Sequence, residues 1–203
     1  MSDGMISSGW DVLDASHEVL RTAVRSVPDD GWHLPTPCER WTVAQVFQHA
    51  VGDQIGFAAA LTGEPGPDFN PFEPSGDLAG ADPTAFLEDA LARAAKAWAG
   101  VDRDAAEVPT PVPPHSMSPW SGSAACGLDA AVHAWDLAAA TGRPSPFPFP
   151  PELARPLLKV AQEIVEPLRA YGAYAAALPV EPADDDTAVL LRYLGRDPHW
   201  SAS

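Results

Sequence analysis

Three side chains in one segment of this chain have the residue types and the spacing of a metal site. Asp129, His133 and Asp136 follow one another at steps of four and three residues. In a helix, at about 100° per residue, the three fall within about 60° of one another and project from one stripe. Carboxylate oxygens and imidazole nitrogens are ligands that suit zinc. The segment therefore predicts a candidate site for a divalent metal.

A second segment offers a ligand from another direction. His49 lies at the edge of an apolar helical face, and Asp53 follows one turn later on the same side. Helical bundles build metal sites from a pair at i and i+4 on one helix and a third ligand on a facing helix. The structural alternative is that an Asp-x-x-x-His pair is an ordinary salt link within a helix. The spacing also leaves open whether Asp129 or Asp136 supplies the carboxylate.

The elements that must position these residues are helices. Apolar residues recur at steps of three and four between stretches rich in proline and glycine. This pattern predicts helices over 10–27, 42–62, 82–99, 121–141, 153–168 and 187–194. It predicts no strand, although a few residues near 177–180 alternate weakly. The chain is thus expected to be all-α: a four-helix bundle with extra C-terminal helices, forming a single domain over 1–203.

Local signals mark the ends of several of these helices. Thr42 and Gln45 form a capping box, and Asp82 followed by Pro83 is typical of a helix start. Glycines at 63, 100 and 142 are expected to end helices. Pro156 fits the first turn of the fifth helix, and Pro167 should kink or end that helix. The loops over 63–80 and 109–120 are expected to shape a pocket.

Charge and composition exclude several classes of protein. The chain of 203 residues carries 12 Lys and Arg against 28 Asp and Glu, a formal net charge of -16. Proteins that bind nucleic acid or anionic membranes need a basic face, so neither partner is expected. No apolar run reaches the roughly 18 residues of a membrane span, and residues 1–11 do not resemble a signal peptide. Two cysteines form no disulfide framework. A cytoplasmic location is expected.

Three separated motifs resemble one family. PTPCERWTVAQVFQHAVG, GLDAAVHAWDLAAATG and LLRYLGRDPHW occur in that order. They resemble an actinobacterial subgroup of the DinB/YfiT-like metal-binding superfamily, which is related to the mycothiol-dependent maleylpyruvate isomerases. The resemblance implies a DinB-like bundle that binds a divalent metal, usually zinc. The family's metal ligands fall on His49, Asp129 and His133. The chain departs from the family's pattern at Asp129, where the family has glutamate, so the shorter side chain must approach more closely, bind through water, or yield to Asp136.

The resemblance also implies a reaction. Two histidines and one carboxylate leave coordination positions open, which is typical of a catalytic site. The implied function is a metal-dependent enzyme that uses a low-molecular-weight thiol such as mycothiol for S-transfer to, or isomerisation of, a small electrophile. The alternatives are a metal-dependent hydrolase of a small molecule and a non-catalytic protein that binds a metal or small molecule. The two-histidine, one-carboxylate set would also suit iron. The protein is expected to be a monomer or a homodimer.

Other polar residues receive structural interpretations. His17 lies on an apolar stripe and is expected to be a hydrogen-bonded core histidine. Cys38 and Cys126 are interpreted as buried, inert thiols. Arg196, together with Asp197, is expected to hold the C-terminal tail on the bundle.

Overall fold

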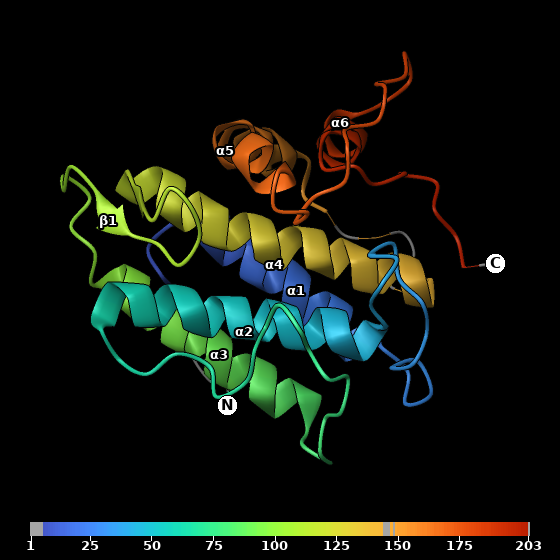
Figure 1. Ribbon diagram of the computed structural model, residues 1–203, viewed down its shortest axis with the longest axis horizontal. Coiled ribbons are helices and arrows are strands. Elements are labelled where there is room, and N and C mark those ends of the chain that lie inside the picture. Colours follow the sequence, from blue (N-terminus) through green and yellow to red (C-terminus); the bar gives the residue numbers. More distant parts are fainter. Residues whose placement is uncertain (1–5, 144–146, 148, 203) are drawn as a thin grey trace.

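The computed structural model describes residues 6–143, 147 and 149–202 (Figure 1). The helices in this part of the chain are α1 (Asp11–Ser26), α2 (Val43–Thr62), α3 (Pro83–Ala99), α4 (Pro119–Thr141), α5 (Pro151–Arg169) and α6 (Asp186–Tyr193). Two short strands, β1 (Val108–Pro109) and β2 (Ser116–Met117), pair antiparallel. Residues 1–5, which belong to the stretch judged not to be a signal peptide, lie outside the described residues.

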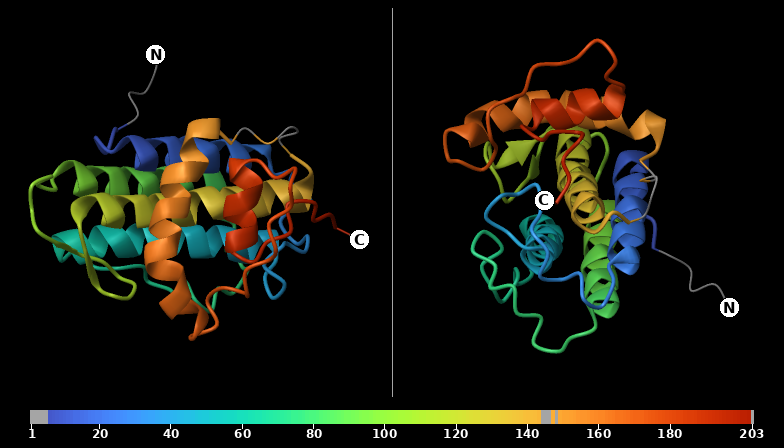
Figure 2. Two further views of the ribbon diagram at one scale, coloured as in Figure 1. Left: turned by 90° about the horizontal axis from the view of Figure 1, so that it is seen from above. Right: turned by 90° about the vertical axis from the view of Figure 1, so that its right-hand side faces the viewer.

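Helices α1 to α4 form a four-helix bundle. The helix α4 packs against α1 and α2, and α3 packs against α2 and α1. Helices α5 and α6 run crosswise to the bundle and cover α4 (Figure 2). The all-α fold expected from the sequence is therefore confirmed. Among the described helices, none combines the length and the apolar character that crossing a membrane requires.

The predicted helix ends that matter for the site are present. Thr42 and Gln45 form the reciprocal capping box at the start of α2. Asp82 caps α3 through the backbone N–H of Thr84. Both α2 and α4 end at a glycine in the left-handed conformation, Gly63 with φ 75° and Gly142 with φ 64°. These local signals fix where α2 and α4 begin or end, and so which of their residues face each other.

Two local expectations differ from the structure. The helix α5 begins at Pro151, so Pro156 lies in its interior rather than in its first turn. The sequence also predicted no strand, whereas two short strands pair within the proline-rich loop before α4. Pro167 stands close to the end of α5, as expected, and the weakly alternating residues 177–180 form no strand. A strand needs a pairing partner, and the local pattern of a few residues carries no information about one.

A buried polar network joins three elements of the bundle. His17 on α1 donates from Nε2 to Oε1 of Gln54 on α2, at 2.9 Å. The Sγ of Cys126 on α4 donates to the same oxygen at 3.1 Å, and the Gln54 amide donates back to the Cys126 carbonyl. All three side chains are almost fully buried. His17 is therefore a core histidine and Cys126 a packed thiol, as the sequence predicted.

His17 should make stability depend on pH in one window. Burial lowers its pKa from 6.5 to about 4, and the hydrogen bond to Gln54 only partly opposes this. Between these values the unfolded chain binds a proton that the folded chain does not, so stability falls as the pH decreases from 6.5 to about 4. We expect this difference to amount to about 3 kcal/mol at the acidic end. Denaturant unfolding of wild type and His17→Gln across that range measures it, with the exposed His33→Gln as the matched control. Identical pH profiles for wild type and His17→Gln would contradict it.

Candidate metal centre

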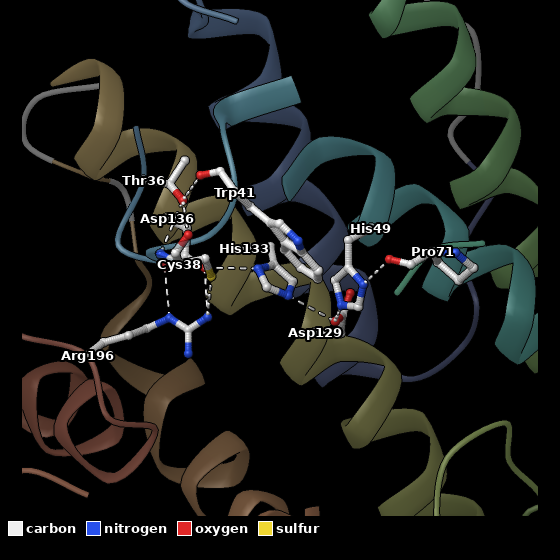
Figure 3. Close-up of polar contacts among 9 residues, drawn as sticks. All are labelled: Thr36, Cys38, Trp41, His49, Pro71, Asp129, His133, Asp136 and Arg196. Atoms are coloured by element: carbon white, nitrogen blue, oxygen red, sulfur yellow. Dashed lines mark hydrogen bonds and ion pairs between the residues drawn. The ribbon is translucent and has the colours of Figure 1, made fainter. Parts of the chain in front are cut away.

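The packing of α2 against α4 brings three predicted ligands together (Figure 3). The Nε2 atom of His49 lies 3.3 Å from Oδ1 of Asp129, and Nε2 of His133 lies 3.3 Å from the same oxygen. The two imidazole rings meet edge to face, with centroids 4.8 Å apart. His49, Asp129 and His133 thus offer one donor atom each to a single point.

These separations fit a metal ion. Two ligand atoms that each lie about 2.0–2.1 Å from one zinc ion at a tetrahedral angle are about 3.3 Å from each other. Two nitrogens and one carboxylate oxygen also form a donor set that zinc prefers. The arrangement therefore meets the geometric requirement of a three-residue site with room for a further ligand.

Hydrogen bonds on the far side of each ring set the orientation of the lone pairs. The Nδ1 atom of His49 lies 2.8 Å from the backbone carbonyl of Pro71. The Nδ1 atom of His133 lies 2.9 Å from Oδ2 of Asp136. Because a carbonyl and a carboxylate only accept, both Nδ1 atoms carry the proton in the neutral rings, and both Nε2 lone pairs point toward Asp129. This is the tautomer that a metal-binding histidine needs.

The Asp129 carboxylate is only partly compensated by its neighbours. Its Oδ2 atom is buried and has no hydrogen-bond partner among the described residues. Burial opposes the ionised carboxylate, but the two imidazoles outweigh it and hold the pKa of Asp129 below its usual value. Burial likewise opposes a charged His133, yet Asp129 and Asp136 raise its pKa well above the usual value. The surroundings therefore favour a positive charge between the rings and the carboxylate, and a proton or a metal cation would supply it.

Asp136 lies behind His133 and not at the point where the three donors meet. Its side chain is 0% exposed. Arg196 contacts both of its oxygens, Nε to Oδ1 and Nη2 to Oδ2, each at 2.8 Å. Arg196 thus attaches the C-terminal tail to the bundle through Asp136, as the sequence predicted for this arginine. The Asp197 carboxylate accepts from the backbone N–H of His199, within the tail itself. The partner of Arg196 is 60 residues away in the chain and is brought close only by the fold.

Cys38 contacts both members of the Asp136–Arg196 pair. Its Sγ lies 3.2 Å from Oδ2 of Asp136 and 3.2 Å from Nη2 of Arg196. Cys38, His133 and Asp136 also have the mutual distances of a metal-binding group. The guanidinium of Arg196, however, already provides the positive charge at that carboxylate, and it would repel a metal ion. The cluster around Asp129 is therefore the better cation site.

A cavity of about 830 Å³ opens beside the three donors. Its irregular walls come from residues 37–41, 111–113, 171–175 and 194–196. Trp41 and Phe72 pack against the His49 ring, with centroids at 4.8 and 5.7 Å. Of the two loops expected to shape the pocket, 109–120 supplies three lining residues, whereas 63–80 supplies Phe72. A cavity of this size accommodates a small organic molecule next to the candidate centre.

Asp53 lines the same cavity. Burial, followed by repulsion from Asp129, raises its pKa well above the usual value. The two acids of the site thus differ in electrostatic environment: the pKa of Asp129 is lowered and that of Asp53 is raised.

Sequence reasoning missed the contacts that orient the rings. The Pro71 acceptor is a backbone carbonyl, which every residue has, so the residue type could not predict this contact. Its approach depends on Gly52, where a Cβ would lie 2.6 Å from Cβ of Pro71. A glycine in the middle of a helix costs stability, and this was the available signal that something packs closely there.

Comparison with known proteins identifies one matching family. Residues 13–138 match the family model described as "Mycothiol maleylpyruvate isomerase N-terminal domain". Two uncharacterized proteins from two strains of Mycobacterium tuberculosis are each 35% identical over 139 residues, which cover 66% of this chain and 66% of each relative. The matched part of the chain is thus just under two thirds of each relative. No solved structure gives a significant match.

Replacing Gly52 with alanine should release His49. The added Cβ would overlap Pro71 and Phe69, so the loop must move and the bond from His49 Nδ1 to the Pro71 carbonyl is lost. Nitrogen-15 NMR of the neutral His49 ring should show Nδ1 protonation in the wild type and a shift toward Nε2 protonation in Gly52→Ala. Gly56→Ala, one turn later, is the matched control because the nearest atom to its Cβ is 3.8 Å away. An unchanged His49 tautomer in Gly52→Ala would show that the Pro71 contact does not orient the ring.

Proposed function

Since the chain belongs to the mycothiol maleylpyruvate isomerase N-terminal domain family, we propose that it binds one divalent metal ion and uses a low-molecular-weight thiol. The metal is zinc, held by His49, Asp129 and His133. The thiol is mycothiol, and the reaction is S-transfer to, or isomerisation of, a small electrophilic substrate.

One observation carries the metal proposal. Two imidazole Nε2 atoms lie at equal distance, 3.3 Å, from one buried carboxylate oxygen, while both Nδ1 atoms are engaged by acceptors. An ordinary salt link within a helix, the alternative considered for this spacing, requires one imidazole and not two. The second imidazole comes from another helix and faces the same oxygen. A shared cation accounts for both contacts, and the second oxygen of Asp129, which has no hydrogen-bond partner in the described part of the chain, agrees with it.

The donor set supports zinc and a catalytic use. With three protein ligands, a tetrahedral ion keeps one position for an exogenous ligand. When bound, such an ion would lower the pKa of a thiol or water and would polarise a carbonyl oxygen. The protein's own contribution is to hold both imidazoles in the required tautomer and to surround the centre with cavity walls that reduce water access.

The cavity supports a small-molecule reaction with a thiol. In S-transfer the thiol sulfur forms a bond to an electrophilic carbon, the leaving group departs with its electron pair, and the thiol proton is released. In an addition that starts an isomerisation, the substrate instead takes up a proton, and the donor in this proposal is Asp53, which lines the cavity and whose pKa burial and Asp129 raise. The walls contributed by aromatic residues such as Trp41 and Phe72 suit the carbon skeleton of the electrophile.

The remaining features of this proposal follow from the sequence. We propose a cytoplasmic protein in which residues 1–203 form one domain, as a monomer or a homodimer. The net charge of -16 supports small-molecule partners over nucleic acid or membranes.

Purified wild-type protein should contain about one zinc ion per chain. We expect His49→Ala, Asp129→Asn and His133→Ala to weaken zinc binding by roughly a hundredfold or more, because losing a residue that merely supports a ligand already costs about 10- to 100-fold. Elemental analysis and competition titration with a zinc chelator measure content and affinity. His33→Ala, at an exposed histidine, is the control and should bind as the wild type. Wild-type protein that fails to bind zinc, iron or any other divalent ion would refute the metal site.

Thiol dependence separates the proposed transferase from the hydrolase. With monochlorobimane as the test electrophile, S-transfer joins the mycothiol sulfur to the bimane carbon and releases chloride, and fluorescence reports the product. We expect a rate above the uncatalysed reaction only when mycothiol is present, and a loss of about 10- to 100-fold or more in His133→Ala. Catalysed loss of the halide without thiol would favour the hydrolase. Zinc binding without turnover of a panel of electrophiles would favour a non-catalytic binding protein.

A further inference from the structure

The C-terminal segment reaches the candidate metal centre through a single arginine. Arg196 follows α6 and lies outside the residues that match the family model, 13–138. Gly195 makes this approach possible: its φ is +79°, and a Cβ there would lie 2.8 Å from Cβ of Ala175 and 2.9 Å from the carbonyl of Ala176. The chain therefore turns sharply between α6 and the tail and directs the guanidinium toward α4 (Figure 3).

The contact made by Arg196 is a side-on, two-point ion pair. Nε and Nη2 each lie 2.8 Å from an oxygen of Asp136. The carboxylate is fully buried and the arginine side chain is 10% exposed. A buried carboxylate without a cation would be strongly destabilised, so Arg196 is what keeps Asp136 ionised and fixed in the plane of the guanidinium.

Asp136 in turn restrains His133 through a hydrogen bond. The oxygen that accepts from Arg196 Nη2, Oδ2, also accepts from Nδ1 of His133 at 2.9 Å. A carboxylate that accepts from Nδ1 fixes the tautomer and the ring plane of a histidine ligand and increases its basicity. Two successive hydrogen bonds, from Arg196 to Asp136 and from His133 to Asp136, thus link the tail to the imidazole that faces Asp129.

Cys38 also contacts the Asp136–Arg196 pair. Its Sγ contacts both Asp136 and Arg196, and its backbone N–H donates to Oγ1 of Thr36 at 3.1 Å. The segment before α2 therefore restricts how far Arg196 and Asp136 can move. No direct bond links Arg196 to His49, Asp129 or His133 in the described residues, so any influence of Arg196 on the centre must act through Asp136 or through the fold.

We propose that Arg196 is a positioning residue of the metal centre, which acts through Asp136 to orient His133. The inference rests on the proposed function, because it assigns the tail a role in metal binding by the same site. It extends the functional unit beyond residues 13–138 and gives the terminal Leu-Gly-Arg-Asp motif a purpose other than attaching the tail to the bundle.

A double-mutant cycle on zinc affinity tests this route. We expect Arg196→Gln and Asp136→Asn each to raise the zinc dissociation constant by about 10- to 100-fold. Because Arg196 acts through Asp136, the double variant should bind no more weakly than Asp136→Asn alone. Arg196→Lys keeps the charge but not the two-point contact, so it should fall between wild type and Arg196→Gln.

Arg192→Gln is the matched control. Arg192 is a buried arginine on α6 that pairs with Glu181 at 2.8 Å and Asp184 at 2.7 Å, away from the centre. Its loss should lower the melting temperature without changing zinc affinity or the absorption spectrum of the cobalt-substituted protein. Arg196→Gln should change both affinity and spectrum. A purely structural role for Arg196 predicts that the two variants behave alike.

A metal-independent measurement separates this inference from the proposed function. In metal-free wild type, proton NMR should show a slowly exchanging Nδ1 proton on His133, which Arg196→Gln loses and Arg192→Gln keeps. If wild type binds no divalent metal but this pattern appears, the proposed function falls and the positioning of His133 by Arg196 stands. If Arg196→Gln and Arg196→Lys retain wild-type zinc affinity and the Nδ1 proton, or if the losses in the double variant multiply, the inference is overturned. Should Arg196→Gln fail to fold, Arg196→Lys decides on the same two measurements.

Discussion

The buried carboxylate of Asp129 is the constraint on which the site depends. An ionised group is costly inside a protein. Within the described residues, one oxygen of Asp129 has no hydrogen-bond partner, and two imidazoles contact the other oxygen. Each imidazole can compensate the charge only by taking up a proton or by sharing a cation. The bundle therefore strongly favours a positive charge at one point, between the Asp129 carboxylate and the two imidazoles. A proton and a metal ion would compete for that point, so metal binding at the proposed site would depend on pH.

The two histidines direct their Nε2 atoms to this point because the Nδ1 atom of each is hydrogen-bonded to a different part of the chain. A loop carbonyl at Pro71 holds His49, and Asp136, itself paired with Arg196, holds His133. The two donors come from rigid helices, while their orientation comes from a loop and from the tail. Close approach at Gly52 and the turn at Gly195 are the backbone features that let these irregular segments reach the helices.

The same irregular segments form the cavity, so binding and orientation are linked. Residues around Cys38 contact the Asp136–Arg196 pair and also line the space next to the three donors. A ligand that displaces these walls would also displace the contacts that orient His133. Asp53 and Asp129 line one cavity, and their pKa values are displaced in opposite directions, an arrangement typical of sites that must both hold a charge and deliver a proton.

Local patterns in the sequence determined the helices and the three donors, and tertiary structure decided how the donors are used. Periodicity and caps such as Thr42 with Gln45 depend on residues within a few positions, so the all-α bundle could be predicted, as could the shared stripe of Asp129, His133 and Asp136. Spacing could not choose between the two carboxylates, because both lie on that stripe. The choice follows from what faces each acid across space: His49 from α2 at Asp129, and Arg196 from the tail at Asp136. Those partners are 80 and 60 residues away in the chain, and no helical period relates residues so far apart.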